Sequence, residues 1–270
     1  MKKLIIPLLA YLLSLSFIFA NENKNIISKT NNTIHIATEE YPPYSSEYLK
    51  DFGINARIIK EVFALYNIKV VFNFYPGARA FKMAKEGKVD ATMPWAKREG
   101  REKFFYYSVP LIQSDTEYFY YLKANKISWD VNKQNYKDIT GTIGTIIGYN
   151  YGKSFNNAID KKDITIEKVS TISQNFKKLL KGHIRIFICQ KKVCDYILNS
   201  KFTKKQRALI KSVPQNKDPI EYDYMLFSKK SKNAKQFRAI FEKGLKNHEL
   251  SLVPVKLRGQ IQFNFQCKEN

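Results

Sequence analysis

The chain has 270 residues, with 46 Lys or Arg against 24 Asp or Glu and a formal net charge of +22 at pH 7. The basic residues are spread along the whole chain rather than gathered in one stripe, which favours a solvated basic surface, itself attractive to anionic ligands, over nucleic-acid binding. The three cysteines have no histidine at ligand spacing and nothing forms a nucleophile–base pair, so we expect no metal, no cofactor and no catalysis.

The first predicted element is an export signal. Lys2 and Lys3 precede an apolar run over residues 4–20, and a polar stretch begins at Asn21. This order is typical of a secretory signal peptide cleaved after Ala20. A retained membrane anchor is the competing interpretation, because the run is close to the lower length for crossing a bilayer. No cysteine follows the cleavage point, so we expect a periplasmic protein without a lipid anchor.

Strands and helices alternate through the first half of the remaining chain. Residues 33–38 alternate as a half-buried strand, and apolar residues recur at helical spacing over 53–66. Such alternation predicts an α/β architecture with mainly parallel sheets and helices on both faces. The further strands expected here are 69–75, 89–93 and 116–122, and a second helix is expected at 78–85.

The second half continues the same alternation. Ser173 is a suitable N-cap for a helix that runs to Leu180, and Gly182 fits its C-terminal end. The other expected strands are 142–147, 185–188 and 222–228, and the other expected helices are 151–158, 192–199 and 234–245.

An ordered motif lies between Tyr75 and Leu111. A Gly-Lys-x-Asp turn leads into an apolar strand, and an arginine follows seven residues ahead of a serine that closes an aromatic run. This pattern resembles that of the family 3 extracellular solute-binding proteins with the type II periplasmic-binding fold. The matching positions are Gly87, Lys88, Asp90, Trp95, Arg101, Phe105, Tyr107, Ser108 and Pro110.

The resemblance covers nearly all of the mature chain and implies two lobes, built on mixed sheets with helices on both faces, with a cleft between them. It implies a signal peptide at 1–20, lobe 1 at 21–122, lobe 2 at 123–220 and a return to lobe 1 at 221–270, with a hinge near Lys123 and Pro219. The pattern of elements by itself also allows two consecutive domains. The implied function is capture of a small, carboxylate-bearing, amino-acid-like solute by a monomer, for delivery to the membrane permease of an ABC importer.

Arg101 is the first candidate binding residue, because a guanidinium matches a carboxylate with two parallel hydrogen bonds. The family's arginine at this position holds the ligand's carboxylate, and the spacing to Ser108 selects Arg101 over Arg98. Trp95 is expected to cover the ligand or to belong to the lobe core. Arg79, in a Pro-Gly-Ala-Arg element that resembles one of a family subgroup, is expected to add a positive contact or to lie on a helix surface.

Two loops at strand ends supply further candidates, because open α/β sheets place ligands at the carboxyl ends of their strands. Tyr41 and Tyr44 follow the first strand and suit stacking against a ligand, although we expect one of them to be structural. Gly148 and Tyr149 join a strand to a helix whose free N–H groups attract anions.

Gln190 marks a departure from the family pattern. It stands where the family has an aspartate that pairs with the ligand's amino group, and Arg185 replaces an earlier acid. An amide accepts a hydrogen bond from ammonium but cannot neutralise it, so we expect ordinary α-amino acids to bind poorly. Two other functions stay open: a dehydratase-like enzyme that uses Glu39 or Glu40, and a ligand-binding sensor that partners a membrane receptor.

The cysteines fit one disulfide and one free thiol in an oxidising compartment. The pairs Cys189–Cys194 and Cys194–Cys267 are equally compatible with the sequence.

Overall fold

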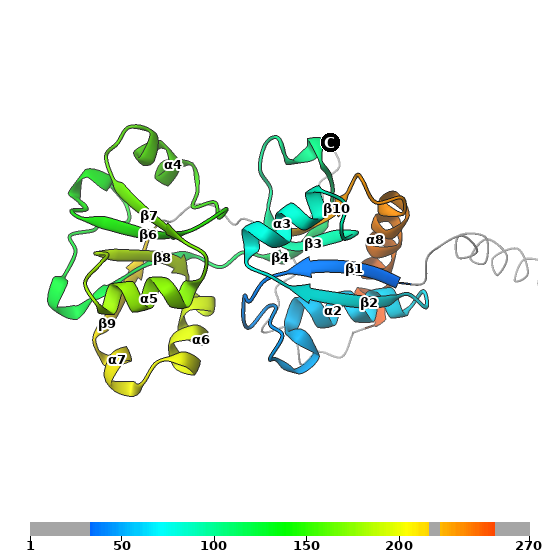
Figure 1. The fold of residues 1–270 in the computed structure, drawn as a ribbon, viewed down its shortest axis with the longest axis horizontal. Helices are drawn as coiled ribbons and strands as arrows, with labels where there is room; N and C mark the ends of the chain where they lie inside the picture. Colours follow the sequence, from blue (N-terminus) through cyan, green and yellow to red (C-terminus); the bar gives the residue numbers. More distant parts are fainter. Residues whose placement is uncertain (1–32, 216–221, 252–270) are drawn as a thin grey trace, which may run out of the picture.

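The computed structural model describes residues 33–215 and 222–251, which form two α/β lobes beside each other (Figure 1). The expected signal peptide, Pro219 and Cys267 lie outside the described residues. Within those residues, no helix combines the length and the apolar character needed to cross a membrane.

The first lobe is built on a five-stranded sheet in the order β2-β1-β3-β10-β4. β1 runs parallel to β2 and β3, whereas β10 runs antiparallel to β3 and β4. The strands are β1 (Thr33–Thr38), β2 (Lys69–Phe74), β3 (Ala91–Ala96), β4 (Phe105–Gln113) and β10 (Tyr222–Ser228). The helices are η1 (Lys50–Phe52), α2 (Ile54–Ala64), α3 (Gly77–Lys85), η2 (Arg101–Lys103) and α8 (Ala234–Ser251).

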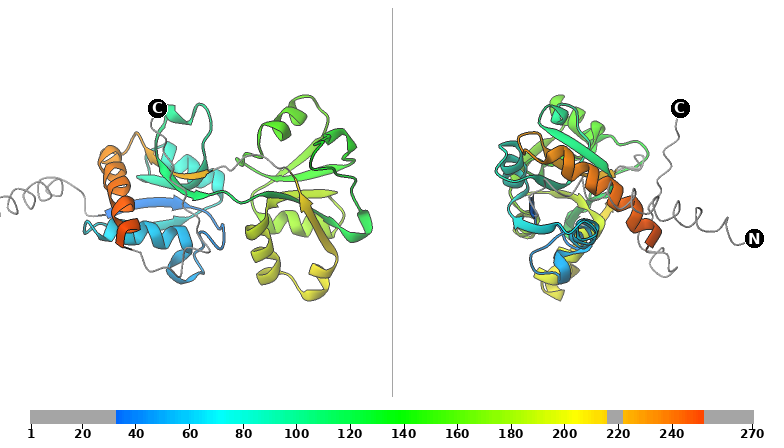
Figure 2. Two further views of the ribbon diagram at one scale, coloured as in Figure 1. Left: turned by 180° about the vertical axis from the view of Figure 1, so that it is seen from behind. Right: turned by 90° about the vertical axis from the view of Figure 1, so that its right-hand side faces the viewer.

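Helix packing closes the first lobe on the side far from the second lobe, where α8 lies against α2 (Figure 2). Apolar residues at helical spacing in α2 face this contact, and Phe63 meets the rings of Phe237 and Phe241 with centroid distances of 6.1 and 5.9 Å. All three rings are fully buried, and burial of each contributes about 1.5–3 kcal/mol. This packing fixes the strands of the first lobe on the side away from the second lobe. The other ends of these strands face the second lobe.

The second lobe repeats this plan in a sheet ordered β7-β6-β8-β5-β9. Here β6 is parallel to β7 and β8, and β5 is antiparallel to β8 and β9. The strands are β5 (Glu117–Leu122), β6 (Thr142–Ile146), β7 (Thr165–Val169), β8 (Ile186–Gln190) and β9 (Ile210–Pro214). The helices are η3 (Lys123–Asn125), η4 (Tyr136–Asp138), α4 (Lys153–Asp160), α5 (Ile172–Leu180), α6 (Lys191–Lys201) and α7 (Lys204–Ala208).

The position of β5 corrects the expected boundary between the lobes. All of β5 pairs with β8 and β9, so the first part of lobe 1 ends before Glu117 and not at Leu122. The sequence shows that residues 116–122 form a strand, but the choice of its partners depends on β8 and β9, which come more than 60 residues later. β10 lies between β3 and β4, so the chain after residue 221 is again part of the first sheet.

Two local predictions also change. Helix α5 begins two residues earlier than expected, because Thr171 and not Ser173 is its N-cap. The Thr171 hydroxyl accepts from the N–H of Gln174, whose side chain accepts from the N–H of Thr171. β3 begins at Ala91 rather than at residue 89, because Asp90 serves the turn, where its carboxylate accepts from the N–H of His35. The open question of the disulfide is answered by a bond between Cys189 and Cys194.

The serine of the motif, Ser108, has a structural role next to strand β10. The register of β10 against β4 shifts between Asp223 and Tyr224 and again between Tyr224 and Leu226, which interrupts the ladder of hydrogen bonds. The Ser108 hydroxyl accepts from the N–H of Met225 at 3.0 Å, so it satisfies a buried backbone donor at the irregularity. The motif's serine is therefore structural, and it supports the strand that carries Asp223.

Candidate functional site

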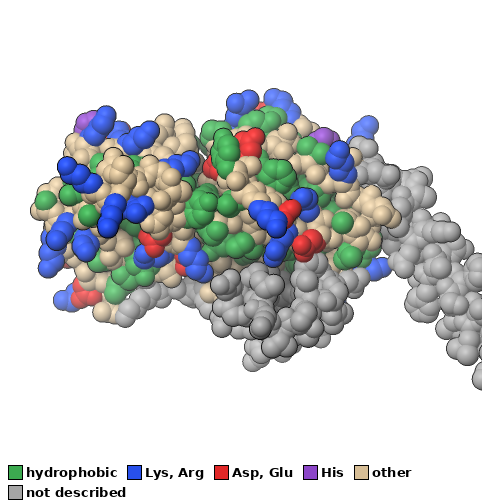
Figure 3. Space-filling model, turned by 90° about the horizontal axis from the view of Figure 1, so that it is seen from below, with side chains coloured by type: hydrophobic (Ala, Val, Ile, Leu, Met, Phe, Trp, Pro, Cys, Tyr) green, Lys and Arg blue, Asp and Glu red, His purple; other side chains and the backbone are tan. Residues whose placement is uncertain are grey.

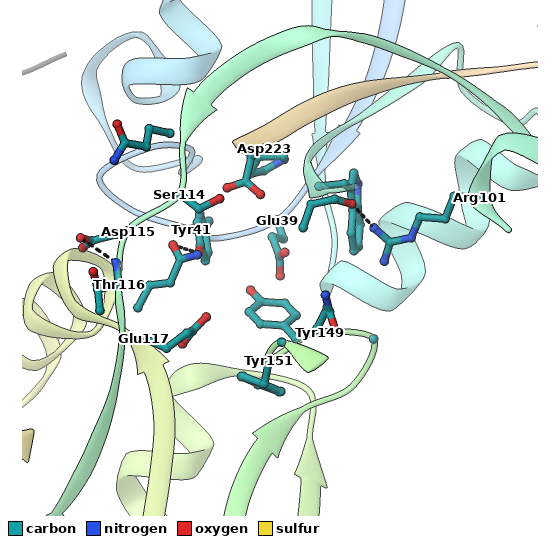
Figure 4. Close-up of a pocket in the computed structure, with 18 residues that line it drawn as sticks. Glu39, Tyr41, Arg101, Ser114, Asp115, Thr116, Glu117, Tyr149, Tyr151 and Asp223 are labelled. Carbon is teal, nitrogen blue, oxygen red and sulfur yellow. Dashed lines mark hydrogen bonds between the residues drawn. The ribbon is translucent and has the colours of Figure 1, made fainter. Parts of the chain in front are cut away.

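A cavity of about 160 Å³ lies between the two lobes and is lined by both. It sits at the carboxyl ends of β1 and β3 in one lobe and of β6 and β8 in the other, the place where open α/β sheets present ligands. Its size suits a small solute rather than a peptide. The lining residues are Glu39, Tyr41, Pro94, Trp95, Ala96, Arg101, Gln113, Ser114, Asp115, Thr116, Glu117, Gly148, Tyr149, Asn150, Tyr151, Gly152, Gln190 and Asp223 (Figure 4).

Arg101 brings a buried positive charge to one side of the cavity. Its side chain lies over the rings of Phe81 and Trp95, at 5.1 and 5.0 Å from their centroids, and its Nη1 donates to the Ala96 carbonyl at 2.8 Å. The residue is only 8% exposed, and burial lowers the pKa of its guanidinium. Among the described residues none of the ion pairs includes Arg101, so its charge has no carboxylate within 4.0 Å. This arrangement leaves the guanidinium suited to an anionic group of a ligand.

Trp95 combines both roles that the sequence suggests. The indole is buried, its Nε1 donates to the Thr92 hydroxyl at 3.0 Å, and its ring meets Phe81 edge to face. It also lines the cavity beside Arg101. The ring therefore belongs to the core of the first lobe and gives the cavity a flat apolar wall.

Glu39 occupies the middle of the cavity and links the lobes. It is buried, and it accepts hydrogen bonds from the Tyr149 hydroxyl of the second lobe and from the N–H of Gly77. Burial raises the pKa of Glu39 to about 7, and the nearby Asp223 carboxylate adds to the rise. A Cβ at Gly77 would lie 2.6 Å from Oε2 of Glu39, so only glycine leaves room for this carboxylate at the start of α3.

Two more carboxylates reach the cavity from residues that the sequence analysis did not select. Glu117 is the first residue of β5, and Asp223 is the second residue of β10. Figure 4 shows them with Glu39 around the cavity, each carried by a different element. One signal was available for Asp223, because an acid inside a strand of buried aromatic and aliphatic residues needs a reason to be there. Glu117 has no such signal.

Asp115 also lines the cavity, but its carboxylate is engaged by the backbone. It accepts from the N–H of Lys192 at 2.7 Å and from its neighbour Thr116 at 3.1 Å. Because Lys192 lies in the first turn of α6, Asp115 satisfies a free N–H at that helix start. Asp115 therefore ties the crossing segment to the second lobe.

Apart from Glu117, the second lobe contributes mainly neutral groups. Gly148 has a φ of +87°, and a Cβ there would touch Ala78 of the first lobe at 3.7 Å, so this loop approaches α3 closely. The Tyr151 hydroxyl accepts from the N–H of Ile146 at 2.7 Å, which fixes its ring behind Tyr149. The Tyr149 and Gly148 predictions thus fall on the cavity wall.

The remaining predicted residues divide into two groups. Tyr41 lines the cavity and donates to Oε1 of Gln190, a hydrogen bond from lobe to lobe, whereas Tyr44 stacks on Tyr41 at 5.9 Å and is not part of the lining. Arg79 does not reach the cavity: it is exposed and lies over the ring of Tyr75, at 4.9 Å from the centroid. The expected second positive contact is absent from the lining, since α3 turns Arg79 toward solvent.

The surface contrasts with the cavity. On the face in Figure 3, Lys and Arg side chains are scattered over both lobes and form no single stripe. Among the residues that the structure describes, no group of three or more His, Cys, Asp or Glu is arranged to hold a metal ion.

Comparison with known proteins identifies related sequences and folds. Residues 34–251 match the family model of the bacterial extracellular solute-binding proteins, family 3. No curated protein gives a significant match.

Many solved structures have the same fold. An ancestral arginine-binding protein bound to arginine has 17% identity and a TM-score of 0.66, with 82% of this chain and 93% of that chain covered. An amino acid ABC transporter substrate-binding protein, AbpA, from Streptococcus pneumoniae, bound to L-arginine, has 13% identity and a TM-score of 0.63, with 84% and 92% covered. A histidine kinase sensor domain with similarity to periplasmic binding proteins has 14% identity and a TM-score of 0.63, with 81% and 91% covered. Identities this low establish the fold alone.

Proposed function

The chain belongs to the bacterial extracellular solute-binding proteins of family 3, and from this premise we propose that it is the periplasmic substrate-binding component of an ABC importer. It binds one small, carboxylate-bearing, amino-acid-like solute in the cavity between its lobes and delivers it, as a monomer, to a membrane permease. Export by the signal at residues 1–20 places it in the periplasm without a lipid anchor. It performs no catalysis.

The observation that carries this proposal is the buried Arg101. A guanidinium that lines a cavity without a carboxylate partner among the described residues is suited to bind a ligand carboxylate through two parallel hydrogen bonds. Trp95 of the first lobe and Tyr149 of the second supply aromatic walls. Because the cavity is shared by both lobes, the ligand bridges them and stabilises the closed arrangement.

The experiment that tests the proposal replaces Arg101 and measures binding by calorimetry, with the solute that co-purifies and is identified by mass spectrometry. Arg101→Ala should weaken binding by about 2–5 kcal/mol, roughly 30-fold to several-thousand-fold, because the ligand's carboxylate is left unpaired. Arg101→Lys should recover only part of the loss, since it keeps the charge without the fork.

Arg98→Ala is the matched control. Arg98 is exposed in the same loop, and its backbone N–H and C=O, not its side chain, contact the Tyr107 hydroxyl. Its replacement should leave affinity unchanged. Equal losses at the two positions would indicate attraction by a diffuse basic surface and would overturn the proposal.

One observation favours a second function, an enzyme of the dehydratase type. Glu39 is a buried carboxylate in the cavity with a pKa of about 7, which suits a group that takes and returns a proton at neutral pH. Proton NMR of the bound solute, recorded over hours, separates the two functions. A binding protein returns the solute unchanged, whereas an enzyme converts it.

A further inference from the structure

The charges inside the cavity have the opposite sign to those of the chain as a whole. Among the described residues, four carboxylates and the guanidinium of Arg101 line it. The Asp115 carboxylate accepts from backbone N–H groups, and the other three come from Glu39, Glu117 and Asp223. The chain carries 46 basic and 24 acidic residues. A cavity with an acidic excess in so basic a protein needs a reason beyond composition.

The three carboxylates act on the same space. Burial raises the pKa of the Tyr41 hydroxyl well above its ordinary range, and the negative charges of Asp223, Glu117 and Glu39 add to that rise. Like charges that meet in a partly desolvated cavity repel one another, which costs stability unless a positive group lies between them. Glu39 takes part in no ion pair among the described residues; its hydrogen bonds come from Tyr149 and Gly77.

A separate polar group in the same wall also points to a ligand. The Ser114 hydroxyl lines the cavity, and its oxygen is buried without a hydrogen-bond partner among the described residues. A buried hydroxyl without a hydrogen-bond partner is unfavourable, and a hydrogen bond from a ligand removes that cost. Ser114 lies in the segment between β4 and β5, close in sequence to Glu117, so it belongs to the same wall as that carboxylate (Figure 4).

We propose that the solute carries more positive than negative charge, as a basic α-amino acid does. This inference rests on the proposed function and specifies its ligand. Arg101 holds the one carboxylate, and the cationic groups lie among Glu39, Glu117 and Asp223. These acids supply the negative charge that Gln190 lacks, so the neutral amide at that position does not prevent recognition of an ammonium group.

A panel of ligands that differ in charge at nearly constant shape tests the inference by calorimetry on the purified protein. L-Arginine should bind roughly tenfold or more tightly than L-citrulline, whose side chain is neutral and of similar shape, because a hydrogen bond between charged partners inside a cavity outweighs a neutral one. Agmatine, which lacks the carboxylate, should bind more weakly than L-arginine through loss of the Arg101 contact. L-Lysine serves as a second basic ligand, and L-glutamate as the acidic one.

The possible results separate this inference from the proposed function. Tighter binding of L-arginine or L-lysine than of the neutral and acidic amino acids supports both. Equal or tighter binding of L-citrulline or L-glutamate overturns the cationic preference and leaves capture of a small carboxylate standing. Absence of binding for the whole panel, together with no co-purifying solute, overturns both.

Substitutions that keep side-chain shape locate the preference. Glu117→Gln should weaken L-arginine binding by roughly tenfold while leaving L-citrulline nearly unchanged, since only the charged ligand loses a charged partner. Glu40→Gln is the matched control, because Glu40 accepts from the N–H of Glu47 outside this cavity. If Glu117→Gln, Asp223→Asn and Glu39→Gln all leave the ratio of the two affinities unchanged, the carboxylates do not select the ligand and the inference fails.

Discussion

The two lobes share one strand arrangement but bring different chemistry to the cleft. In each sheet three parallel strands are followed by a fourth that runs antiparallel to them and adjoins a crossing between the lobes. The fifth, at the edge of the sheet, is antiparallel to the fourth. The first lobe contributes three charged side chains to the lining, Glu39, Arg101 and Asp223, beside neutral ones such as Trp95. The second contributes mainly neutral polar and aromatic groups, Tyr149 and Gln190 among them.

Glu117 is the exception, and its place in the fold is informative. It begins β5, which occupies the same place in the second sheet that β10, the strand of Asp223, occupies in the first. Both acids therefore lie where the chain adjoins a crossing. The comparison teaches that one scaffold supports two kinds of wall, and that the strand-end residues, not the fold, set the chemistry. In the binding mode that we propose, the first lobe grips the charges of the ligand and the second covers it.

The largest expected effect is a pH dependence of the free energy of unfolding, which arises from Glu39 in the first lobe. The ordinary pKa of Glu39 is 4.5 and rises to about 7 in the folded protein, so the folded state binds more protons than the unfolded state between these values. Stability from this group is fully present below pH 4.5 and is lost as the pH rises to 7. At 1.36 kcal/mol per tenfold change in proton affinity, the loss amounts to about 3 kcal/mol.

Urea unfolding of the wild-type protein and of Glu39→Gln between pH 4.5 and 7.5 measures this loss. The wild-type free energy of unfolding should fall relative to that of the variant as the pH rises. The groups that face Glu39 are Tyr149, Gly77 and Asp223, and the two hydrogen-bond donors do not titrate in this range. Glu40→Gln should follow the wild-type curve. Parallel curves for Glu39→Gln and wild type would show that folding does not raise the pKa of Glu39.

The second effect concerns the second lobe, which contains a disulfide bond next to Gln190. The bond between Cys189 on β8 and Cys194 on α6 encloses Gln190 in a loop of a few residues. The disulfide restricts the unfolded chain by closing this short loop. Reduction of the disulfide should therefore lower the free energy of unfolding by about 2 kcal/mol.

Hydrogen exchange with and without a reductant, on a Cys267→Ser background that removes the remaining thiol, measures this effect. Exchange should accelerate in β8 and α6 and stay unchanged in β1 and β3 of the first lobe. Equal acceleration in both lobes would mean that they unfold as one cooperative unit and that the comparison does not extend to stability.

The smallest effect comes from moving charge to the neutral wall. Gln190→Asp places a carboxylate beside Tyr41, opposite the first-lobe acids. It should tighten binding of ammonium-bearing solutes by up to about tenfold, or about 1 kcal/mol, because the site is partly exposed and the new charge is screened. Plain carboxylates without an ammonium group should gain nothing. An equal gain for both classes would show that position 190 acts through loop geometry and not through charge.

Much of the fold follows from local patterns. The alternation in β1 and the helical spacing in α2 identify these elements, and the motif around Arg101 locates the charged end of the cavity. The N-cap of α5 was also within reach of the sequence: Thr171 has a glutamine three residues later, as a capping box requires, and Ser173 has Phe176.

The rest depends on contacts between distant parts of the chain. Glu117 and Asp223 are 106 residues apart and meet because β5 and β10 each join a sheet built mostly from other parts of the sequence. No periodicity reports such a meeting. Arg79 is the opposite case. The Pro-Gly-Ala-Arg element made it a candidate binding residue, but the orientation of α3 turns its side chain toward solvent.

A crystal structure of the protein with L-arginine bound tests the central claim most directly. We predict that the ligand's carboxylate forms two hydrogen bonds of about 2.7–2.9 Å with the Arg101 guanidinium, and that its cationic groups lie among Glu39, Glu117 and Asp223 under the cover of Tyr149. A ligand that lies outside this cavity, or that turns its carboxylate toward the second lobe and away from Arg101, would contradict the division of roles between the lobes.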